Sequence, residues 1–167
     1  MMGGEIRVAS EPGRGSTFSF TARFSRGKAL EPETEQTLDL DTVAAALGGS
    51  LMLIVEDNPV NQQVVREVLE QVGVIVTVAA DGRDALAAVA TRDGRFDAIL
   101  MDLQMPEMDG FEATLMIRPQ WSADRLPIIA MTAHTRREER ERCPAAGTND
   151  HLSKPVNPNR LYACLLQ

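Results

Sequence analysis

The stretch DAILMDLQMPEMDGFE, residues 97–112, decides how this chain folds. Its apolar run, residues 98–101, ends in a single carboxylate, Asp102, which Leu103 follows directly. A strand on a protein surface alternates apolar and polar side chains, and this segment does not. We therefore interpret it as a strand that is buried on both faces and ends by presenting an aspartate.

Three further apolar runs of the same kind lie on either side of this strand. They are LMLIV at 51–55, VIVTVA at 74–79 and PIIAM at 127–131. Short, nearly unbroken runs rich in β-branched residues suit parallel strands, because helices cover both faces of a parallel sheet. Helical patterns separate the runs, and the first of them places valines four residues apart, on one face of a helix.

Two of the expected helices begin with the same pair of residues. Asn58 and Pro59 open the first helix, and Asn157 and Pro158 open the last. Asparagine caps a helix N-terminus, and proline is accepted at the first helical position. From residue 50 onward a strand followed by a helix is thus repeated five times. This order predicts an α/β fold with a parallel sheet, helices on both faces and right-handed crossovers.

The first 49 residues differ in composition from the rest. Residues 27–49 carry five acidic side chains against one lysine and no aromatic residue, so we interpret them as an acidic linker, in which residues 38–47 could form a short helix. Residues 1–26 contain a turn, EPGRGS, followed by phenylalanines that alternate with polar residues, as in a half-buried strand of a β-hairpin. The predicted domains are therefore this hairpin, the linker and an α/β domain at 50–167.

The composition excludes several classes of protein. The net charge of −7 argues against a nucleic-acid-binding surface or an anionic-membrane surface. No apolar run reaches the roughly 18 residues of a membrane-spanning helix, so we expect no membrane contact by this chain, even if its parent protein is membrane-anchored. Cys143 and Cys164 are not closely spaced, and no signal peptide precedes them. We therefore expect reduced thiols and a cytoplasmic location.

Polar side chains stand at the ends of four expected strands. Glu56 and Asp57 follow the first strand, Asp102 ends the third, Thr132 follows the fourth, and Lys154 comes late in the fifth. The site of an open parallel sheet lies outside the carboxyl ends of its strands, so we expect these groups to converge. Three neighbouring carboxylates repel one another and need counter-charges, which Lys154 and a hard divalent cation, Mg²⁺, would supply. Any one of these carboxylates alone would be interpreted as a solvated loop residue.

These segments resemble the receiver domains of two-component response regulators. LMLIVEDNPVNQQVV, AILMDLQMPEMDGFEA, PIIAMTA and HLSKPV follow one another in the order and spacing of that family, over about residues 50–167. The resemblance implies a flavodoxin-like, doubly wound sheet of five strands in the order 2-1-3-4-5. The segment from MTAHT to AAGTNDHLSKPV is most similar to receivers that are attached to hybrid histidine kinases.

The resemblance also implies a chemistry. Glu56 and Asp57 would be the acidic pair on Mg²⁺, Asp102 would be a metal ligand and the phospho-acceptor, and the backbone carbonyl of Gln104 would complete the protein's ligands. The phosphoryl donor would be the phosphohistidine of a sensor histidine kinase, and a histidine phosphotransfer protein would be a further partner. The chain would then modify itself and have no turnover substrate in the usual sense.

By the same resemblance, Thr132 and Lys154 would bind the phosphoryl oxygens. Gln104 and His134 lie two residues after Asp102 and Thr132, so we expect both to flank the water that attacks the acyl phosphate and so to tune its hydrolysis. Three residues before the lysine, the family usually has Tyr or Phe, whose ring turns inward as the threonine moves. This sequence has His151 there, either as a switch residue coupled to Thr132 or as an exposed polar residue with no such role.

The segment MGGEIRVASEPGRGSTFSFTARF, within residues 1–26, resembles the end of a histidine-kinase ATP-binding domain. The Asn- and Asp-bearing boxes of such a domain are absent from this sequence. The chain is therefore interpreted as part of a hybrid histidine kinase that does not itself bind ATP usefully.

Two alternative functions belong to other classes. A degenerate receiver, kept only as a protein-interaction module, would lack the acceptor, the acid pair or the lysine, and none of these is missing. A hydrolase that uses a nucleophilic aspartate and Mg²⁺ would place a second Asp two residues after the nucleophile. Gln104 stands at that position.

Overall fold

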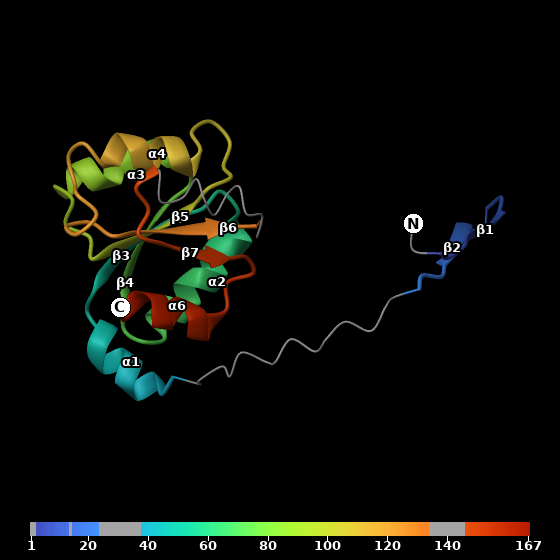
Figure 1. Ribbon diagram of the computed structural model, residues 1–167, viewed down its shortest axis with the longest axis horizontal. Helices are drawn as coiled ribbons and strands as arrows, with labels where there is room; N and C mark the ends of the chain where they lie inside the picture. The colour runs from blue at the N-terminus through green and yellow to red at the C-terminus, as the bar shows by residue number, and fades with distance from the viewer. Residues whose placement is uncertain (1–2, 14, 24–37, 134–145) are drawn as a thin grey trace. The chain divides into compact units, whose positions relative to one another are not determined.

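The computed structural model describes most of the chain and divides it into two compact units, Met1–Glu35 and Gln36–Gln167 (Figure 1). The described residues are 3–13, 15–23, 38–133 and 146–167. The predicted helix before the last strand, and with it His134 and Cys143, falls in residues 134–145, outside the described residues.

The larger unit is built on one parallel sheet of five strands in the order β4-β3-β5-β6-β7. In the order in which the strands occur within this unit, that is 2-1-3-4-5, so the predicted flavodoxin-like topology is confirmed. The strands are β3 (Leu51–Val55), β4 (Ile75–Ala79), β5 (Ala98–Asp102), β6 (Ile128–Thr132) and β7 (Asp150–Ser153).

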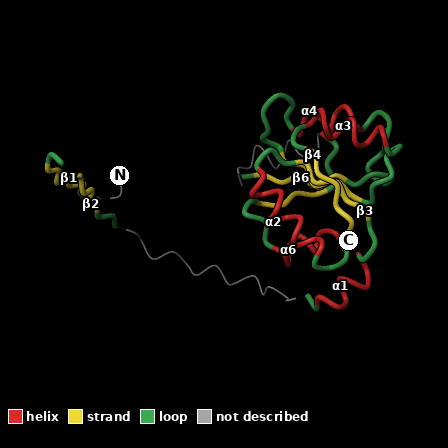
Figure 2. Tube along the Cα trace, turned by 180° about the vertical axis from the view of Figure 1, so that it is seen from behind, coloured by secondary structure: helices red, strands yellow, loops and turns green. Residues whose placement is uncertain are grey.

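Helices cover both faces of this sheet (Figures 1 and 2). On one face lie α3 and α4, and on the other lie α2 and α6, with α1 beside them. These helices are α1 (Leu40–Leu47), α2 (Pro59–Glu70), α3 (Gly82–Thr91), α4 (Gly110–Ile117) and α6 (Pro158–Leu165).

The sheet separates two hydrophobic cores. Successive side chains of β3 alternate between them, since Met52 and Ile54 pack with α2 and α6 whereas Leu53 and Val55 pack with α3 and α4. All five residues of β5 are buried. This strand lies between β3 and β6 and is covered on both faces, which is why its sequence shows no alternation.

Helix α2 begins as the sequence predicts, but its buried face differs from the expected valine stripe. The Asn58 side chain accepts a hydrogen bond from the Val60 amide and so caps the helix. Val65 and Leu69 are buried, whereas Val60 is 69% exposed and Val64 is 49% exposed. Two valines of the stripe therefore face solvent and leave an apolar surface on this helix.

Helix α1 lies inside the segment that the composition predicts to be linker. Its Asp39 cap accepts from the Thr42 amide and hydroxyl, and Val43 and Leu47 are buried in the core of the larger unit. Their four-residue spacing puts both on the face that meets the sheet domain. Because this compact unit begins at Gln36, the last part of the segment predicted as linker, 27–49, is folded together with the α/β domain.

The smaller unit contains an antiparallel hairpin of β1 (Ile6–Glu11) and β2 (Gly15–Phe20). Ile6 is paired with Phe20 and Val8 with Phe18, and all four side chains are more than half exposed. The half-buried strand expected from the alternation thus has an apolar face that this unit does not cover.

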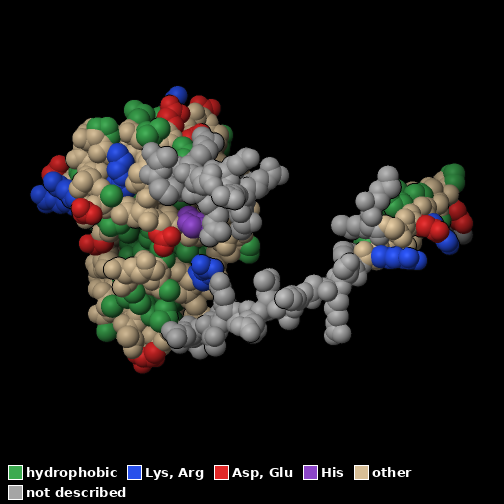
Figure 3. All heavy atoms as spheres, viewed as in Figure 1, with side chains coloured by type: hydrophobic (Ala, Val, Ile, Leu, Met, Phe, Trp, Pro, Cys, Tyr) green, Lys and Arg blue, Asp and Glu red, His purple; other side chains and the backbone are tan. Residues whose placement is uncertain are grey.

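None of the helices in the described part of the chain is both long and apolar enough to cross a membrane. On the face of the larger unit seen in Figure 3, the described acidic and basic side chains are interspersed and do not gather by sign.

Candidate functional site

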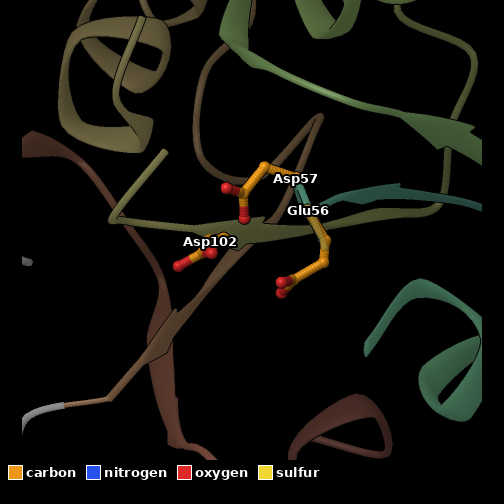
Figure 4. A group of neighbouring side chains, drawn as sticks. All are labelled: Glu56, Asp57 and Asp102. Atoms are coloured by element: carbon orange, nitrogen blue, oxygen red, sulfur yellow. The ribbon is translucent and has the colours of Figure 1, made fainter. Parts of the chain in front are cut away.

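Three carboxylates meet at the carboxyl ends of β3 and β5. Glu56 and Asp57 directly follow β3, Asp102 is the last residue of β5, and the two strands are paired in register. One oxygen of each carboxylate lies within 4.8 Å of the others (Figure 4). Asp57 is exposed, whereas Glu56 and Asp102 are only 1% and 3% exposed. The sequence-predicted acidic cluster is therefore brought together at this edge of the sheet.

Lys154 connects two of these carboxylates. Its ammonium nitrogen lies 2.5 Å from Glu56 Oε2 and 2.6 Å from Asp102 Oδ2. The lysine follows β7, and its backbone amide donates to the carbonyl of Thr132 at the end of β6 (2.8 Å). The position of β7 beside β6 therefore determines where the Lys154 ammonium lies in the site.

Burial and charge act in opposite directions on this ion pair. Burial raises the pKa of the Asp102 carboxyl, although hydrogen bonds from Lys154 and from the Gln104 amide favour its ionised form. Burial alone would lower the pKa of Lys154, but its bonds to Asp102 and Glu56 outweigh burial and raise it. One ammonium thus stays charged between two buried carboxyl groups.

The loop after β5 closes over Asp102 because glycine stands at the start of α4. The Gln104 amide donates to Asp102 Oδ1 (3.0 Å), and Asp109 caps α4 by accepting from the Glu112 amide (2.8 Å). A Cβ atom on Gly110 would lie 2.1 Å from the backbone oxygen of Asp102. Only glycine lets the helix begin this close to Asp102.

Thr132 and His151 lie on neighbouring strands at different depths. Thr132 ends β6, is 2% exposed and is paired in register with Ser153. His151 is paired with Ala130, and its imidazole Nδ1 lies 3.6 Å from Asp150 Oδ1, with the side chain 32% exposed. The structure thus places Thr132 at the rim with Lys154 and His151 two positions earlier on β7.

Two amide side chains at the site are absent from the sequence-based prediction. Asn61 Nδ2 donates to Glu56 Oε1 (2.8 Å), and Gln62 Nε2 donates to the backbone carbonyl of Glu56 (2.7 Å). Both residues belong to the first turn of α2. The signal that could have found them is their position, since the first turn of a helix after a strand faces the end of that strand.

A groove of about 380 Å³ adjoins the carboxylates on the α2 side of the sheet. Its polar end is formed by side chains of the site and the rest of its lining is mostly apolar. The lining residues are Glu56, Asn61, Val64, Val65, Met131, Lys154, Pro155 and Val156.

The donor set fits a hard divalent cation. All three clustered side chains offer carboxylate oxygens, which are the ligands that Mg²⁺ prefers. A cation would also offset the negative charge that Lys154 leaves unbalanced. Residues 52–166 match the family model described as response regulator receiver domain. The chain belongs to this family.

Two solved receiver domains resemble this chain over most of its length. The receiver domain of sensor histidine kinase PA1611 from Pseudomonas aeruginosa PAO1 is 45% identical, with a TM-score of 0.64 over 71% of this chain and 95% of that chain; its structure has a magnesium ion coordinated in the active-site cleft. The Ssk1 receiver from Saccharomyces cerevisiae, crystallised with the histidine phosphotransfer protein Ypd1, is 29% identical, with a TM-score of 0.63 over 71% of this chain and 88% of that chain.

The aerobic respiration control sensor protein ArcB of Escherichia coli strain K12 is 34% identical over 165 residues. The match covers 98% of this chain but only 20% of ArcB. The chain is therefore a receiver of two-component signalling, related to hybrid histidine kinases and much shorter than they are.

Proposed function

We propose that this receiver accepts a phosphoryl group on Asp102 from a phosphohistidine. The observation that carries the proposal is the position of this carboxylate, which is buried at the end of β5, 2.6 Å from Lys154 and clustered with two further carboxylates. A degenerate receiver would have no need for this arrangement, because two buried carboxylates that share one lysine cost desolvation energy and do not serve the stability of the fold.

In the proposed transfer, a carboxylate oxygen of Asp102 forms a bond to phosphorus as the phosphorus–nitrogen bond of the donor breaks. The electron pair of that bond stays on the imidazole nitrogen, and the product is an acyl phosphate. Positioning and charge stabilisation account for most catalysis of this kind. Lys154 and the Thr132 hydroxyl are the proposed donors to the phosphoryl oxygens.

Asp57, Asp102, Glu56 and the Gln104 carbonyl are the proposed ligands of Mg²⁺, directly or through water. When bound, the cation would neutralise charge on the transferring group. Mg²⁺ in the cleft of the PA1611 receiver supports this assignment.

The partner is proposed to dock on α2 and the groove beside it. Val60 and Val64 expose apolar surface on this helix, and Val64 also lines the groove that ends at Glu56 and Lys154. A protein that presents a phosphohistidine, either a sensor kinase or a histidine phosphotransfer protein, would cover this surface and deliver its imidazole to Asp102. The complex of the Ssk1 receiver with Ypd1 supports this class of partner.

The parent protein is proposed to be a cytoplasmic or membrane-anchored hybrid kinase, with residues 1–26 as the end of its ATP-binding domain. The match to ArcB, which extends over 98% of the chain, supports that context. The switch role of Thr132 with His151 and the hydrolysis-tuning roles of Gln104 and His134 also stay proposals.

Incubation with acetyl phosphate and Mg²⁺, followed by intact-mass measurement, tests the acceptor. The wild-type chain should gain the mass of one phosphoryl group, and Asp102→Asn should gain none. Asp124→Asn, which changes an exposed aspartate in the loop before β6, is the matched control and should be modified like the wild type. Undiminished modification of Asp102→Asn would refute the assignment.

A further inference from the structure

The two carboxylate oxygens of Glu56 have different partners. Oε1 accepts from Asn61 of α2 (2.8 Å), and Oε2 accepts from Lys154 (2.5 Å), which also bonds Asp102. A continuous chain of hydrogen bonds therefore runs from α2 through Glu56 and Lys154 to the acceptor. Glu56 is 1% exposed, so water contributes little to holding its carboxylate.

A buried carboxylate held at both oxygens has a fixed orientation, whereas one held at a single oxygen can turn about its last bond. If Glu56 rotated, Oε2 would leave the Lys154 ammonium, whose second partner is Asp102. The Gln62 amide bonds the backbone carbonyl of Glu56 (2.7 Å), so it holds the main chain but leaves the carboxylate free to turn. Within this network, Asn61 is the contact that sets the orientation of the Glu56 carboxylate.

We propose that Asn61 is a positioning residue of the phosphorylation site, acting through Glu56 on Lys154 and on the cation site. This inference rests on the proposed function of the site. It makes the first turn of α2 part of the chemistry, on the same helix whose exposed valines are proposed to meet the partner. Hydrogen-bond partners behind metal ligands typically contribute 10- to 100-fold to metal affinity or activity.

The lysine content of the chain offers a direct readout. Lys28 and Lys154 are its two lysines, so ¹⁵N-lysine labelling gives two ammonium signals, which Lys28→Arg assigns. The Lys154 signal should move in Asn61→Ala, because Glu56 Oε1 loses its donor. It should also move in the near-isosteric Asn61→Asp, which replaces that donor by a repelling carboxylate. Gln63→Ala is the matched control, since Gln63 is exposed on the same helix and bonds Glu67.

Mg²⁺ titration of the same samples, followed at the Gln104 amide, supplies the second readout. Asn61→Ala should weaken Mg²⁺ binding about 10-fold, with Gln63→Ala unchanged. Glu56→Gln serves as the positive control for both readouts. If Asn61→Ala fails to fold, both measurements are made on Asn61→Asp instead.

The inference is overturned if both Asn61 variants keep the wild-type Lys154 signal and Mg²⁺ affinity while Glu56→Gln changes them. Failure of the proposed function looks different. The wild-type chain would then take up neither Mg²⁺ nor a phosphoryl group, while the Lys154 signal would still report whether Asn61 orients Glu56.

Discussion

Single residues of the site hold the proposed acceptor carboxylate, Asp102, in place. Burial raises the pKa of the Asp102 carboxyl, and direct hydrogen bonds from the Lys154 ammonium and the Gln104 amide offset part of that rise. Each oxygen of Asp102 has its own donor, so the side chain has one orientation. Such preorganisation is the main contribution that a protein can make to the proposed transfer.

The lifetime of the acyl phosphate should depend on Gln104. Its amide is fixed on Asp102 while its side chain is exposed at the rim, where it can restrict the approach of water. In Gln104→Ala the acyl phosphate should therefore be hydrolysed several-fold faster, with little change in the rate of phosphorylation. The decay is followed by intact mass after removal of acetyl phosphate, with Glu112→Ala, exposed on α4, as control. An unchanged decay would mean that other groups govern water access.

Cys164 should react slowly with alkylating reagents. Burial, the hydrogen bond from its thiol to Asp150 (3.1 Å) and the charge of that carboxylate raise its pKa to about 12. Only the thiolate reacts, so the rate should climb about tenfold per pH unit up to pH 10, where an ordinary thiol of pKa near 8.5 has levelled off. Iodoacetamide labelling in a Cys143→Ser background measures this. With Asp150→Asn added, Cys164 should be labelled faster at every pH. A labelling rate that levels off below pH 9 while Asp150 is intact would contradict the raised pKa of the thiol.

At the scale of elements, α4 is held at both ends by different means. Its N-terminus fits against β5 because Gly110 has no side chain, and its C-terminus ends at Ile117, two residues before Pro119. Arg118 caps that end, and its guanidinium donates to the carbonyls of Gly147, Trp121 and Leu126 and to the Asn149 side chain. This arginine joins α4, the following loop and the segment before β7.

Loss of the Arg118 clamp should destabilise the receiver without touching the site. Arg118→Met keeps much of the side-chain volume but leaves buried carbonyls without donors, which should cost about 3 kcal/mol of unfolding free energy. Arg83→Met, exposed on α3, should cost less than about 0.5 kcal/mol. Urea unfolding of both variants measures the difference. Equal stabilities would show that water replaces the guanidinium at no cost.

For the whole molecule, the parts that follow from local patterning could be predicted. Apolar runs without alternation locate the buried strands, and strand ends locate Asp102 and Lys154, because parallel topology brings carboxyl ends to one edge. Which valines of α2 are buried could not be predicted from sequence. Val60 and Val65 have the same chemistry, and only packing in the fold makes one exposed and the other buried. The bond from Asn61 to Glu56 depends on distances that spacing does not encode.

The N-terminal boundary of the receiver could not be predicted for a similar reason. The segment at 27–49 has the acidic composition of a linker, yet one of its acids, Asp39, acts as a helix cap and two of its apolar residues, Val43 and Leu47, enter the core. Composition averages over these residues, whereas folding depends on where each one lies. The family match begins at residue 52 and so also leaves α1 out.

Truncation from the N-terminus should therefore have two different effects. Removing residues 1–35 deletes a separate compact unit, so stability and phosphorylation by acetyl phosphate should not change. Removing residues 1–49 also deletes α1 and uncovers the core where Val43, 0% exposed, is packed. Each buried apolar side chain of this size contributes about 2 kcal/mol, so the shorter chain should unfold at clearly lower urea.

Two point variants separate this packing effect from the effect of chain length. Val43→Ala in the full chain should lose about 2 kcal/mol, because the cavity left under α1 cannot close completely. Val60→Ala removes the same atoms from a side chain that is 69% exposed, and its cost should be small. Urea unfolding of the truncated chains and of both variants decides the matter. If neither removal of residues 1–49 nor Val43→Ala changes the urea midpoint of unfolding, α1 does not stabilise the receiver, and the folded domain begins at β3.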